Sequence, residues 1–445
     1  MSYDAIVVGG GISGLLSALV LTKEEKDVIL LERDSFVGGN VRSYELEGYR
    51  VDTGPHAITY INDGPLRELM DRYFVRVPEF LPYGKYYVRD SRNFLPFPWT
   101  MLAWARFAIL PLEDRLQLIK VMGSAMTASA FRGVDLNASL YDYLRACRLS
   151  DRTWKFVDAL SYFMSGKSMK EMPAWRMLKG ARYVQETDRR SLGERFRKVL
   201  KLFSYDGAYH QGYPREGLGD ILSCLLDSIP VERFQLKLDS NVESILVSDG
   251  KVRGVSTSDE TFDSDLVIYS GCASQLPNLV GGLPEEYAKK LSSLEQSTSV
   301  SIWLGFGKRL PELDYVGSEI WFESGKPYWG MPTSNYNSRF APDGKQLAVF
   351  TSYVEGDARK AESELLETVY SAIPSAEGNA EFKHVQVTHP EKAALSVNYQ
   401  FPQASTPVAG LYLVGTDTDM RSMGITRAAF SVQTLVGLLK QKKTL

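Results

Sequence analysis

A glycine-rich turn near the start of the chain, Gly9-x-Gly11-x-x-Gly14, constrains the fold more than any other feature. The apolar run at residues 5–8 predicts a buried strand, and the small and aliphatic residues 13–22 predict a helix. In this strand–turn–helix order, the glycines permit a tight turn, a close approach of a pyrophosphate and close packing of helix on strand. The phosphates would lie at the positive end of the helix. The pattern therefore favours a dinucleotide site over a structural βαβ unit without a ligand.

A second predicted strand, "DVILLE", ends in Glu32. A carboxylate at this position can accept hydrogen bonds from the hydroxyls of the adenosine ribose. The same N-terminal stretch is not typical of an export signal, because Asp4 stands where a positive charge is expected and three consecutive glycines would break the helix. We therefore expect an intact N-terminus and a cytoplasmic protein.

Composition limits the other possibilities. A chain of 445 residues is too long for one ordinary core, which indicates two domains or one domain with a large insertion. The net charge of −3 shows no basic excess that would indicate a nucleic-acid partner. The three cysteines form no CxxC pair and the four histidines have no metal-ligand spacing. We expect no metal site and an organic cofactor.

The residues after Glu32 indicate which dinucleotide binds. Gly38-Gly39 follows the acid, and "DTGPHA" follows a predicted β-pair. At this point the chain resembles the flavoprotein superfamily of amine oxidases, phytoene desaturases and protoporphyrinogen oxidases. The resemblance implies that Gly38-Gly39 lies near the FAD phosphates and that the loop Gly54 to Ala57 lies beside the flavin. Asn40 departs from the usual GGR and is similar to the GGN of some protoporphyrinogen oxidases.

The C-terminal block agrees with this resemblance. It contains a predicted strand, a turn at Gly415 to Asp417, and a predicted helix from about Ile425. In the family, the acid of this turn binds the ribityl chain and the first amides of the last helix face the N1/O2 edge of the flavin. Reduced flavin is anionic at N1, and a helix N-terminus stabilises negative charge. A middle segment (241–271) resembles the family's third contribution to the FAD domain, and places Val242 at the adenine.

The resemblance thus implies an FAD contact set that spans the chain. It consists of Gly9, Gly11, Ile12, Ser13, Gly14, Glu32, Arg33, Gly38, Gly39, Asn40, Gly54, Pro55, His56, Ala57, Val242, Gly415, Asp417, Gly424, Ile425 and Thr426.

The expected fold class is α/β. A Rossmann-like FAD-binding domain would be discontinuous, built from residues 1–75, 207–280 and 395–445. Residues 76–206 and 281–394 would form an α+β substrate-binding domain with a helical cap. Because the sequence holds a single dinucleotide fingerprint, a separate NAD(P)H domain is not expected. Electrons would pass between the flavin and oxygen, a quinone or another mobile acceptor.

Two stretches raise the question of a membrane surface. Phe94 to Pro111 is strongly apolar, but two prolines and Arg106 interrupt it, so it is not a membrane-spanning helix. It could be a monotopic bilayer contact or the mouth of an apolar tunnel, although a buried cap helix is the interpretation we favour. Residues 176–201 carry nine Lys/Arg and three Asp/Glu, which could meet anionic lipids or form a solvated helix face. The protein could therefore lie peripherally on the inner face of a membrane.

The expected chemistry is hydride transfer between a substrate carbon and flavin N5, in which the protein supplies position and electrostatics. The catalytic residues are unknown. His56 is a weak candidate for a proton acceptor, and a hydrogen bond to backbone or flavin is its more ordinary role. Arg421 and Arg427 could orient an acidic substrate or pair with a cofactor phosphate.

We predict an FAD-dependent oxidoreductase of the phytoene-desaturase/protoporphyrinogen-oxidase type, acting on a hydrophobic, polyisoprenoid-like or porphyrinogen substrate. The alternatives are a flavin amine oxidase and a flavoprotein binding module without turnover. The amine-oxidase alternative is weakened because Tyr328 and Trp329 cannot be mapped to an aromatic cage beside the flavin.

Overall fold

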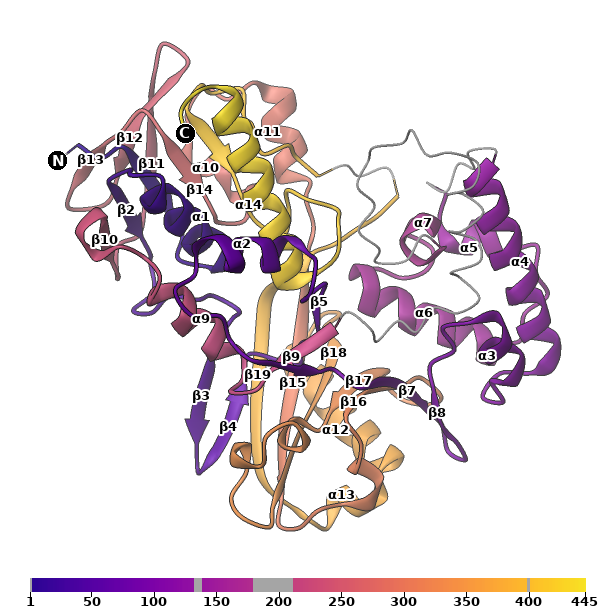
Figure 1. The fold of residues 1–445 in the computed structure, drawn as a ribbon. Helices are drawn as coiled ribbons and strands as arrows, with labels where there is room; N and C mark the ends of the chain where they lie inside the picture. The colour runs from indigo at the N-terminus through magenta and orange to yellow at the C-terminus, as the bar shows by residue number, and fades with distance from the viewer. Residues whose placement is uncertain (1, 132–137, 179–210, 398–400) are drawn as a thin grey trace.

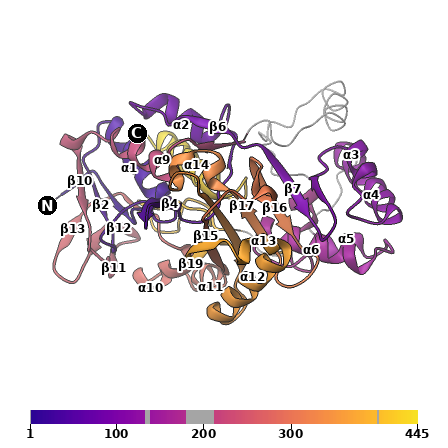
Figure 2. The same ribbon diagram turned by 90° about the horizontal axis from the view of Figure 1, so that it is seen from below.

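The computed structural model describes residues 2–131, 138–178, 211–397 and 401–445. These residues form three parts: a domain around a parallel sheet, a large mixed sheet, and a group of helices at the far side of that sheet (Figure 1). Seen from below, the helical group and the parallel sheet lie at opposite ends of the molecule, with the mixed sheet between them (Figure 2).

The parallel sheet has five strands in the order β10-β2-β1-β14-β20. Their bounds are Phe234–Lys237, Val28–Leu31, Ala5–Val8, Val267–Tyr269 and Leu411–Leu413. All four pairings are parallel, and every residue of β1 and β2 is buried. Strands covered on both faces have this continuous apolar character. The α/β fold class is therefore confirmed, and the sheet draws its strands from three distant parts of the chain.

Different layers cover the two faces of this sheet. Ala5 and Val7 pack toward a helical layer, whereas Ile6 and Val8 pack toward an antiparallel sheet and two short helices. The helical layer contains α1 (Ile12–Lys23), α2 (Pro65–Tyr73), α9 (Leu218–Leu226) and α14 (Gly424–Gln441). The opposite layer contains β11 (Ser244–Ser248), β12 (Lys251–Ser256), β13 (Thr261–Asp263), α10 (Leu276–Leu279) and α11 (Glu285–Ser292). Helix α11 thus packs with this layer, although its residues belong to the second predicted insertion.

The mixed sheet has seven strands in the order β19-β15-β18-β17-β16-β7-β8. Their bounds are Ala380–Ala393, Gln296–Phe306, Gln346–Tyr353, Tyr328–Met331, Gly317–Trp321, Lys85–Arg89 and Phe94–Pro96. Neighbouring strands are antiparallel except for the parallel pair β16 and β7. Val300, Ile302 and Leu304 of β15 pack with the core of α12 (Ala358–Ala372) and α13 (Pro374–Glu377), while Trp303 packs on the other face. The long strands β15 and β19 run from the parallel-sheet domain into this layer (Figure 1).

The helical cap packs on the β7/β16 side of the mixed sheet. It consists of α3 (Met101–Arg106), α4 (Leu112–Phe131), α5 (Leu140–Leu144), α6 (Asp151–Ser165) and α7 (Ala174–Leu178). Phe156 lies at its centre and is fully buried together with Val88 and Ile320 of the sheet. The hydroxyl of Ser150 caps the first turn of α6 by accepting a hydrogen bond from the Thr153 amide.

Two small sheets join these parts. β3 (Ser43–Leu46) pairs with β4 (Tyr49–Asp52), and β9 (Gln211–Pro214) lies between β5 (Ile58–Thr59) and β6 (Phe80–Pro82). Short 3-10 turns occur at Val231–Arg233, Ala273–Gln275, Pro311–Leu313, Thr333–Asn335 and Ser338–Phe340. The boundaries assigned to the two domains remain a prediction.

Of the two stretches considered for a membrane surface, the structure describes the first in full and only the start of the second. In Phe94 to Pro111 only six residues are helical; Trp104 and Phe107 are buried, whereas Leu102 is 62% exposed. The stretch therefore contains one short helix, Met101–Arg106, with a buried and an exposed side, in place of the buried cap helix that we favoured. Of the basic stretch at residues 176–201, Arg176 is described and is buried; residues 179–201 lie outside the described part. None of the helices within the described residues has the length and apolarity needed to cross a bilayer.

Candidate functional site

A single cavity of 1510 Å³ extends from the glycine-rich turn after β1 to the helices of the cap. Small-molecule sites usually occupy about 300 to 1,000 Å³. This cavity therefore has room for a dinucleotide together with a second ligand. At one end its wall is made by the loops after β1, β2 and β20 and the start of α14, and at the other by α3 to α7.

Two glycine turns form the floor of the first end. The amide of Gly38 donates to the carbonyl of Gly10 (2.8 Å), which places the two turns side by side. A Cβ on Gly11 would meet nothing within 4 Å, so its backbone is open to the cavity. A Cβ on Gly14 would lie 2.0 Å from the Gly9 carbonyl oxygen. Gly14 thus provides the close helix–strand packing, while Gly11 leaves the space that a pyrophosphate needs.

Two helix N-termini open into the same cavity. Gly11 and Ile12 at the start of α1 line it, as do Met423 and Gly424 at the start of α14. Within the described residues no side chain caps either helix, and neither has an acidic residue in its first turn. Free backbone N–H groups with positive end dipoles are suited to anionic ligands.

Glu32 lies at the end of β2, where it lines the cavity. One carboxylate oxygen accepts the Gly10 amide (2.6 Å) and the other accepts the Asp34 amide (2.9 Å). These bonds fix the carboxylate against the glycine turn, and each oxygen keeps a further lone pair. The arrangement suits two neighbouring hydroxyls such as those of a ribose.

Asp417 lies in the turn after β20 and is 4% exposed. Its carboxylate accepts the amide of Ala273 (2.6 Å) and borders the cavity. Burial raises the pKa of Asp417 to about 6. A ligand hydroxyl beside Asp417 would meet a carboxyl group whose charge depends on pH and on the bound ligand.

The GGN turn adds two polar side chains. Asn40 donates from Nδ2 to the Pro390 carbonyl (3.0 Å), so the asparagine ties this turn to β19. Arg42 lines the cavity, stacks over the ring of Phe36 (3.6 Å to the centroid) and has a buried Nε without a hydrogen-bond partner in the described structure. A phosphate bound at the two glycine turns could accept a hydrogen bond from this N–H group.

The structure brings most of the expected contact set to this cavity. Those that line it are Gly9, Gly11, Ile12, Ser13, Glu32, Arg33, Gly38, Gly39, Asn40, Pro55, His56, Ala57, Val242, Gly415, Asp417, Gly424 and Ile425. Three others lie behind the wall. Gly14 packs on Gly9, the Gly54 amide donates to Gln386 (3.0 Å), and the Thr426 hydroxyl donates to the Thr59 carbonyl (3.0 Å).

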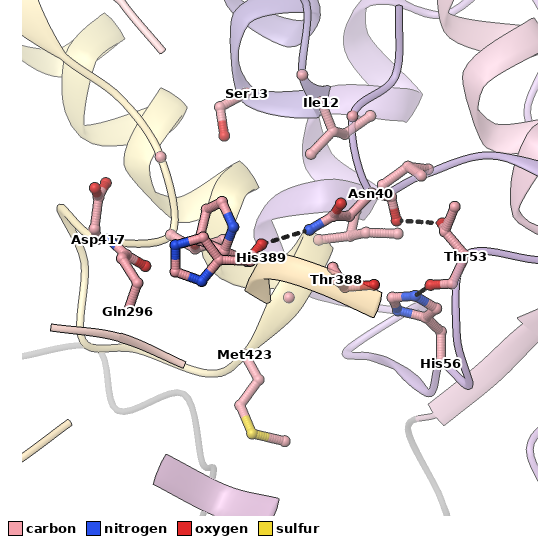
Figure 3. A pocket seen from close by; sticks show the side chains of 18 of the residues that line it. Ile12, Ser13, Asn40, Thr53, His56, Gln296, Thr388, His389, Asp417 and Met423 are labelled. Carbon is pink, nitrogen blue, oxygen red and sulfur yellow. Dashed lines mark hydrogen bonds between the residues drawn. The ribbon is translucent and has the colours of Figure 1, made fainter. Parts of the chain in front are cut away.

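His56 lines the cavity, but one ring nitrogen is already used. Its Nε2 lies 2.8 Å from the Thr53 carbonyl oxygen, which requires the proton on Nε2 and leaves Nδ1 as an acceptor (Figure 3). This geometry agrees with the more ordinary role expected for His56, a hydrogen bond to backbone. Arg421 pairs with Asp419 (2.6 Å), and Arg427 donates to main-chain carbonyl oxygens. A role of either arginine toward an acidic substrate or a cofactor phosphate stays a prediction.

Sequence reasoning did not identify the polar residues that β15 and β19 bring to the cavity. Gln296, Thr388 and His389 point into it between Asp417 and His56 (Figure 3). His389 is oriented by a 2.8 Å hydrogen bond between Nδ1 and the Thr298 hydroxyl. For Thr388 alone a signal was available, the alternation of polar residues at 384, 386 and 388, because strand residues two apart share a face.

The other end of the cavity is apolar. The cap, β17 and the segment after β8 contribute its walls, which include Phe97, Trp104, Phe156, Phe163, Met164 and Trp329. None of the carboxylates that line the cavity (Glu32, Asp34, Glu243 and Asp417) comes from the described cap residues. No group of three metal-binding side chains occurs in the described part of the chain. The cavity thus joins an anion-binding end to an apolar end.

The family model for flavin-containing amine oxidoreductases matches residues 12–431. The chain belongs to this family. It is an FAD-dependent oxidoreductase, and the open backbone at Gly11, the two uncapped helices and the unsatisfied Arg42 fit the phosphates and flavin of FAD.

Individual similarities are more distant. A 1-hydroxycarotenoid 3,4-desaturase of Flavobacterium sp. is 24% identical over 336 residues, covering 70% of this chain and 65% of that protein. A chloroplastic prolycopene isomerase of Arabidopsis thaliana is 23% identical, covering 100% of this chain and 84% of that protein. The crystal structure of an oxidoreductase from Methanosarcina mazei has a TM-score of 0.77 at 21% identity, covering 98% and 100% of the two chains. That structure shows the same fold.

Proposed function

We propose that this FAD-dependent oxidoreductase dehydrogenates, saturates or isomerises an extended apolar substrate, with a polyisoprenoid as the first candidate and a porphyrinogen as the second. The observation that carries the proposal is the continuity of the cavity. The glycine cradle and the apolar end belong to one space of 1510 Å³, so a hydrocarbon in the cap can reach a flavin held at the other end. The similarity to a carotenoid desaturase and a prolycopene isomerase supports the same substrate class.

The chain's own residues would act by position and exclusion of water. Bound FAD supplies hydride transfer at N5. The amides of Gly424 and Ile425 would stabilise negative charge at N1, Glu32 would hold the ribose and Asp417 the ribityl chain. Aromatic and methionine side chains would hold the substrate and keep the reacting carbon dry. We propose oxygen or a quinone as the electron acceptor.

Three imidazoles line the cavity, those of His56, His384 and His389, and His389 is the best candidate for proton transfer. The Nε2 of His384 lies 2.8 Å from the Tyr44 hydroxyl. His56 spends its Nε2 proton on the Thr53 carbonyl. His389 lines the same cavity (Figure 3) and is held at Nδ1 by the Thr298 hydroxyl, so Nε2 is the nitrogen left for a ligand. A general acid or base must be held in this way while one nitrogen stays available.

We further propose peripheral contact with a lipid surface at the corner of α3 and α4. Leu102, Leu112 and Leu116 are 62%, 56% and 54% exposed. On the same two helices, Trp104 and Leu118 line the cavity. An apolar substrate could pass from a bilayer into the cavity here without crossing water.

The test is anaerobic titration of the purified, FAD-loaded protein with polyprenyl lipids, porphyrinogens and amines, followed at the flavin absorption. Bleaching by a lipid or porphyrinogen is the expected result, and reoxidation in the presence of that product class would reveal the reverse direction. Bleaching by amines alone, with hydrogen peroxide released in air, would replace the proposal with an amine oxidase. A bound flavin that no donor reduces would leave a binding module without turnover.

A further inference from the structure

Two arginines are buried behind the wall of the cavity. Arg176 in α7 is 1% exposed and Arg427 in the first turn of α14 is 2% exposed. Arg176 comes from the cap, whereas Arg427 belongs to the helix whose N-terminus opens into the cofactor end. Charged side chains are rarely buried to this extent, and each such case calls for an explanation.

Both guanidinium groups donate to one carbonyl oxygen, that of Ser422. Arg176 reaches it from Nη2 (3.1 Å), and Arg427 reaches it from Nη2 (2.9 Å) and Nε (3.2 Å). Ser422 has φ +56°, a left-handed conformation that costs energy for a residue other than glycine. The converging donors hold it in place. The next two residues, Met423 and Gly424, begin α14 and line the cavity.

Among the residues that the structure describes, no acid balances the charge of Arg176. Its other partner is the Met164 carbonyl (Nε, 3.1 Å), and no carboxylate pairs with it in the described residues. Burial, together with the charge of Arg427, lowers the pKa of Arg176 to about 9. It remains charged at neutral pH. Carbonyl oxygens accept hydrogen bonds from Nε and Nη2 but leave most of the positive charge uncompensated.

The neighbours of Arg176 belong to both ends of the cavity. Met164, whose carbonyl it holds, and Met177, its neighbour in the chain, line the apolar end. Ser422 precedes the helix N-terminus at the cofactor end. Arg176 therefore connects the cap to the loop that would face the flavin.

We propose that Arg176 is a positioning residue that fixes the Ser422 loop against the flavin and, through its uncompensated charge, favours the reduced form of the cofactor. The inference rests on FAD binding at the site described above, but not on the identity of the substrate. Two-electron reduction with uptake of one proton leaves a flavin with one negative charge. A nearby positive charge stabilises that state relative to the neutral oxidised flavin, so the midpoint potential rises.

The test is the midpoint potential of bound FAD, measured by equilibration with redox dyes and dithionite in the absence of substrate. Arg176→Gln keeps a hydrogen-bond donor and removes the charge, whereas Arg176→Lys keeps the charge. We expect the Gln variant to disfavour reduction about tenfold, which is about 30 mV for a two-electron couple, and the Lys variant to restore most of the potential. The matched control is Arg152→Gln, another cap arginine, which is balanced by Asp90 and Glu323.

Arg152→Gln should lower the melting temperature without moving the potential. The proposal is overturned if Arg176→Gln has the wild-type potential, or if Arg176→Lys loses as much potential as Arg176→Gln. If Arg176→Gln does not fold, Arg176→Met replaces it. A wild-type potential in Arg176→Lys with a lowered potential in Arg176→Met would support the proposed role of Arg176. Equal potentials in the Lys and Met variants would exclude that role. Failure of the wild-type protein to bind FAD would instead overturn the proposed function.

Discussion

At the scale of single residues, Gly11 and Gly14 of the first glycine-rich turn are required for different reasons. A methyl group on Gly14 would overlap the Gly9 carbonyl, whereas one on Gly11 would project into the open cavity. Gly14→Ala should therefore destabilise the protein with or without FAD, by roughly 1 to 3 kcal/mol, as overpacking does. Gly11→Ala should leave the melting temperature of the apoprotein unchanged and weaken FAD binding, because the methyl group occupies the place of the pyrophosphate.

Thermal unfolding with and without FAD distinguishes these two effects, and flavin fluorescence gives the dissociation constant. Equal destabilisation of the two apoprotein variants would contradict the assignment. So would wild-type FAD affinity in Gly11→Ala.

Asp417 gives a prediction about pH. Its folded pKa of about 6 lies above the ordinary value of 3.8, so the folded apoprotein binds a proton that the unfolded chain releases between about pH 4 and 6. The contribution of Asp417 to stability is complete below pH 4 and is lost as the pH rises to 6. Asp417→Asn should remove this dependence and gain on the order of 3 kcal/mol relative to wild type across that interval.

Urea unfolding of both apoproteins at a series of pH values checks the sign. A stability difference between the variant and wild type that does not change from pH 4 to 7 would show that burial does not raise the pKa of Asp417. The same Asn variant should bind FAD more weakly at neutral pH if the carboxylate accepts hydrogen bonds from the ribityl chain.

The residues of the cofactor end could be anticipated from the sequence because local spacing determines them. Gly9 to Gly14 follow one strand, and the acid at the end of the next strand follows from βαβ geometry. Gln296 and His389 could not be anticipated in this way. They reach the cavity through the long pairing of β15 with β19, a contact between residues far apart in the chain that no local pattern encodes.

At the scale of elements, α6 belongs both to the cap core and to the wall of the apolar end of the cavity. Met164 of this helix lines the cavity, while Lys155 of the same helix is exposed. Met164→Trp should fill the cavity and slow flavin reduction by an extended lipid at least about tenfold, since small displacements of the reacting carbon are costly. Lys155→Trp is the matched control and should leave the rate unchanged.

Stopped-flow measurement of flavin bleaching provides these rates, and the absorption spectrum shows whether each variant retains FAD. A Met164→Trp variant that bleaches as fast as wild type would place the substrate elsewhere. Loss of FAD from this variant would contradict the assignment of Met164 to the substrate end.

The individual elements were largely predictable, whereas their limits in the cap were not. β1 and β2 have apolar patterns that their burial on both faces explains. The continuously buried run of α14, residues 425–432, is its first half. The run from Phe94 to Pro111 is uniformly apolar in sequence but contains a short helix with one exposed side. Composition alone cannot show which side of such a run meets the core, because that depends on the sheet beneath it.

At the scale of the whole molecule, the cavity exists because distant segments of the chain meet. The parallel sheet combines β1 and β2 with β10, β14 and β20, and the loops that follow β1, β2, β14 and β20 surround the cofactor end. The segments between these strands build the mixed sheet and the cap, which close the apolar end. Different stretches of the sequence thus form the cofactor end and the substrate end of one continuous cavity.

The proposed lipid contact is a property of the molecular surface as a whole. Replacing Leu102, Leu112 and Leu116 by Ser together should reduce binding to vesicles that contain anionic lipid several-fold, because the apolar area available for insertion is lost. Val231→Ser is the control, since Val231 is 85% exposed at a distant site. Co-sedimentation measures the bound fraction.

Flavin reduction by a substrate embedded in vesicles should fall in the triple variant, whereas reduction by the same substrate in detergent should not, because the cavity is unchanged. If the triple variant co-sediments as wild type does, the α3–α4 corner is not the membrane contact; if both reduction rates fall equally, the leucines act on the fold of the cap and not on substrate delivery.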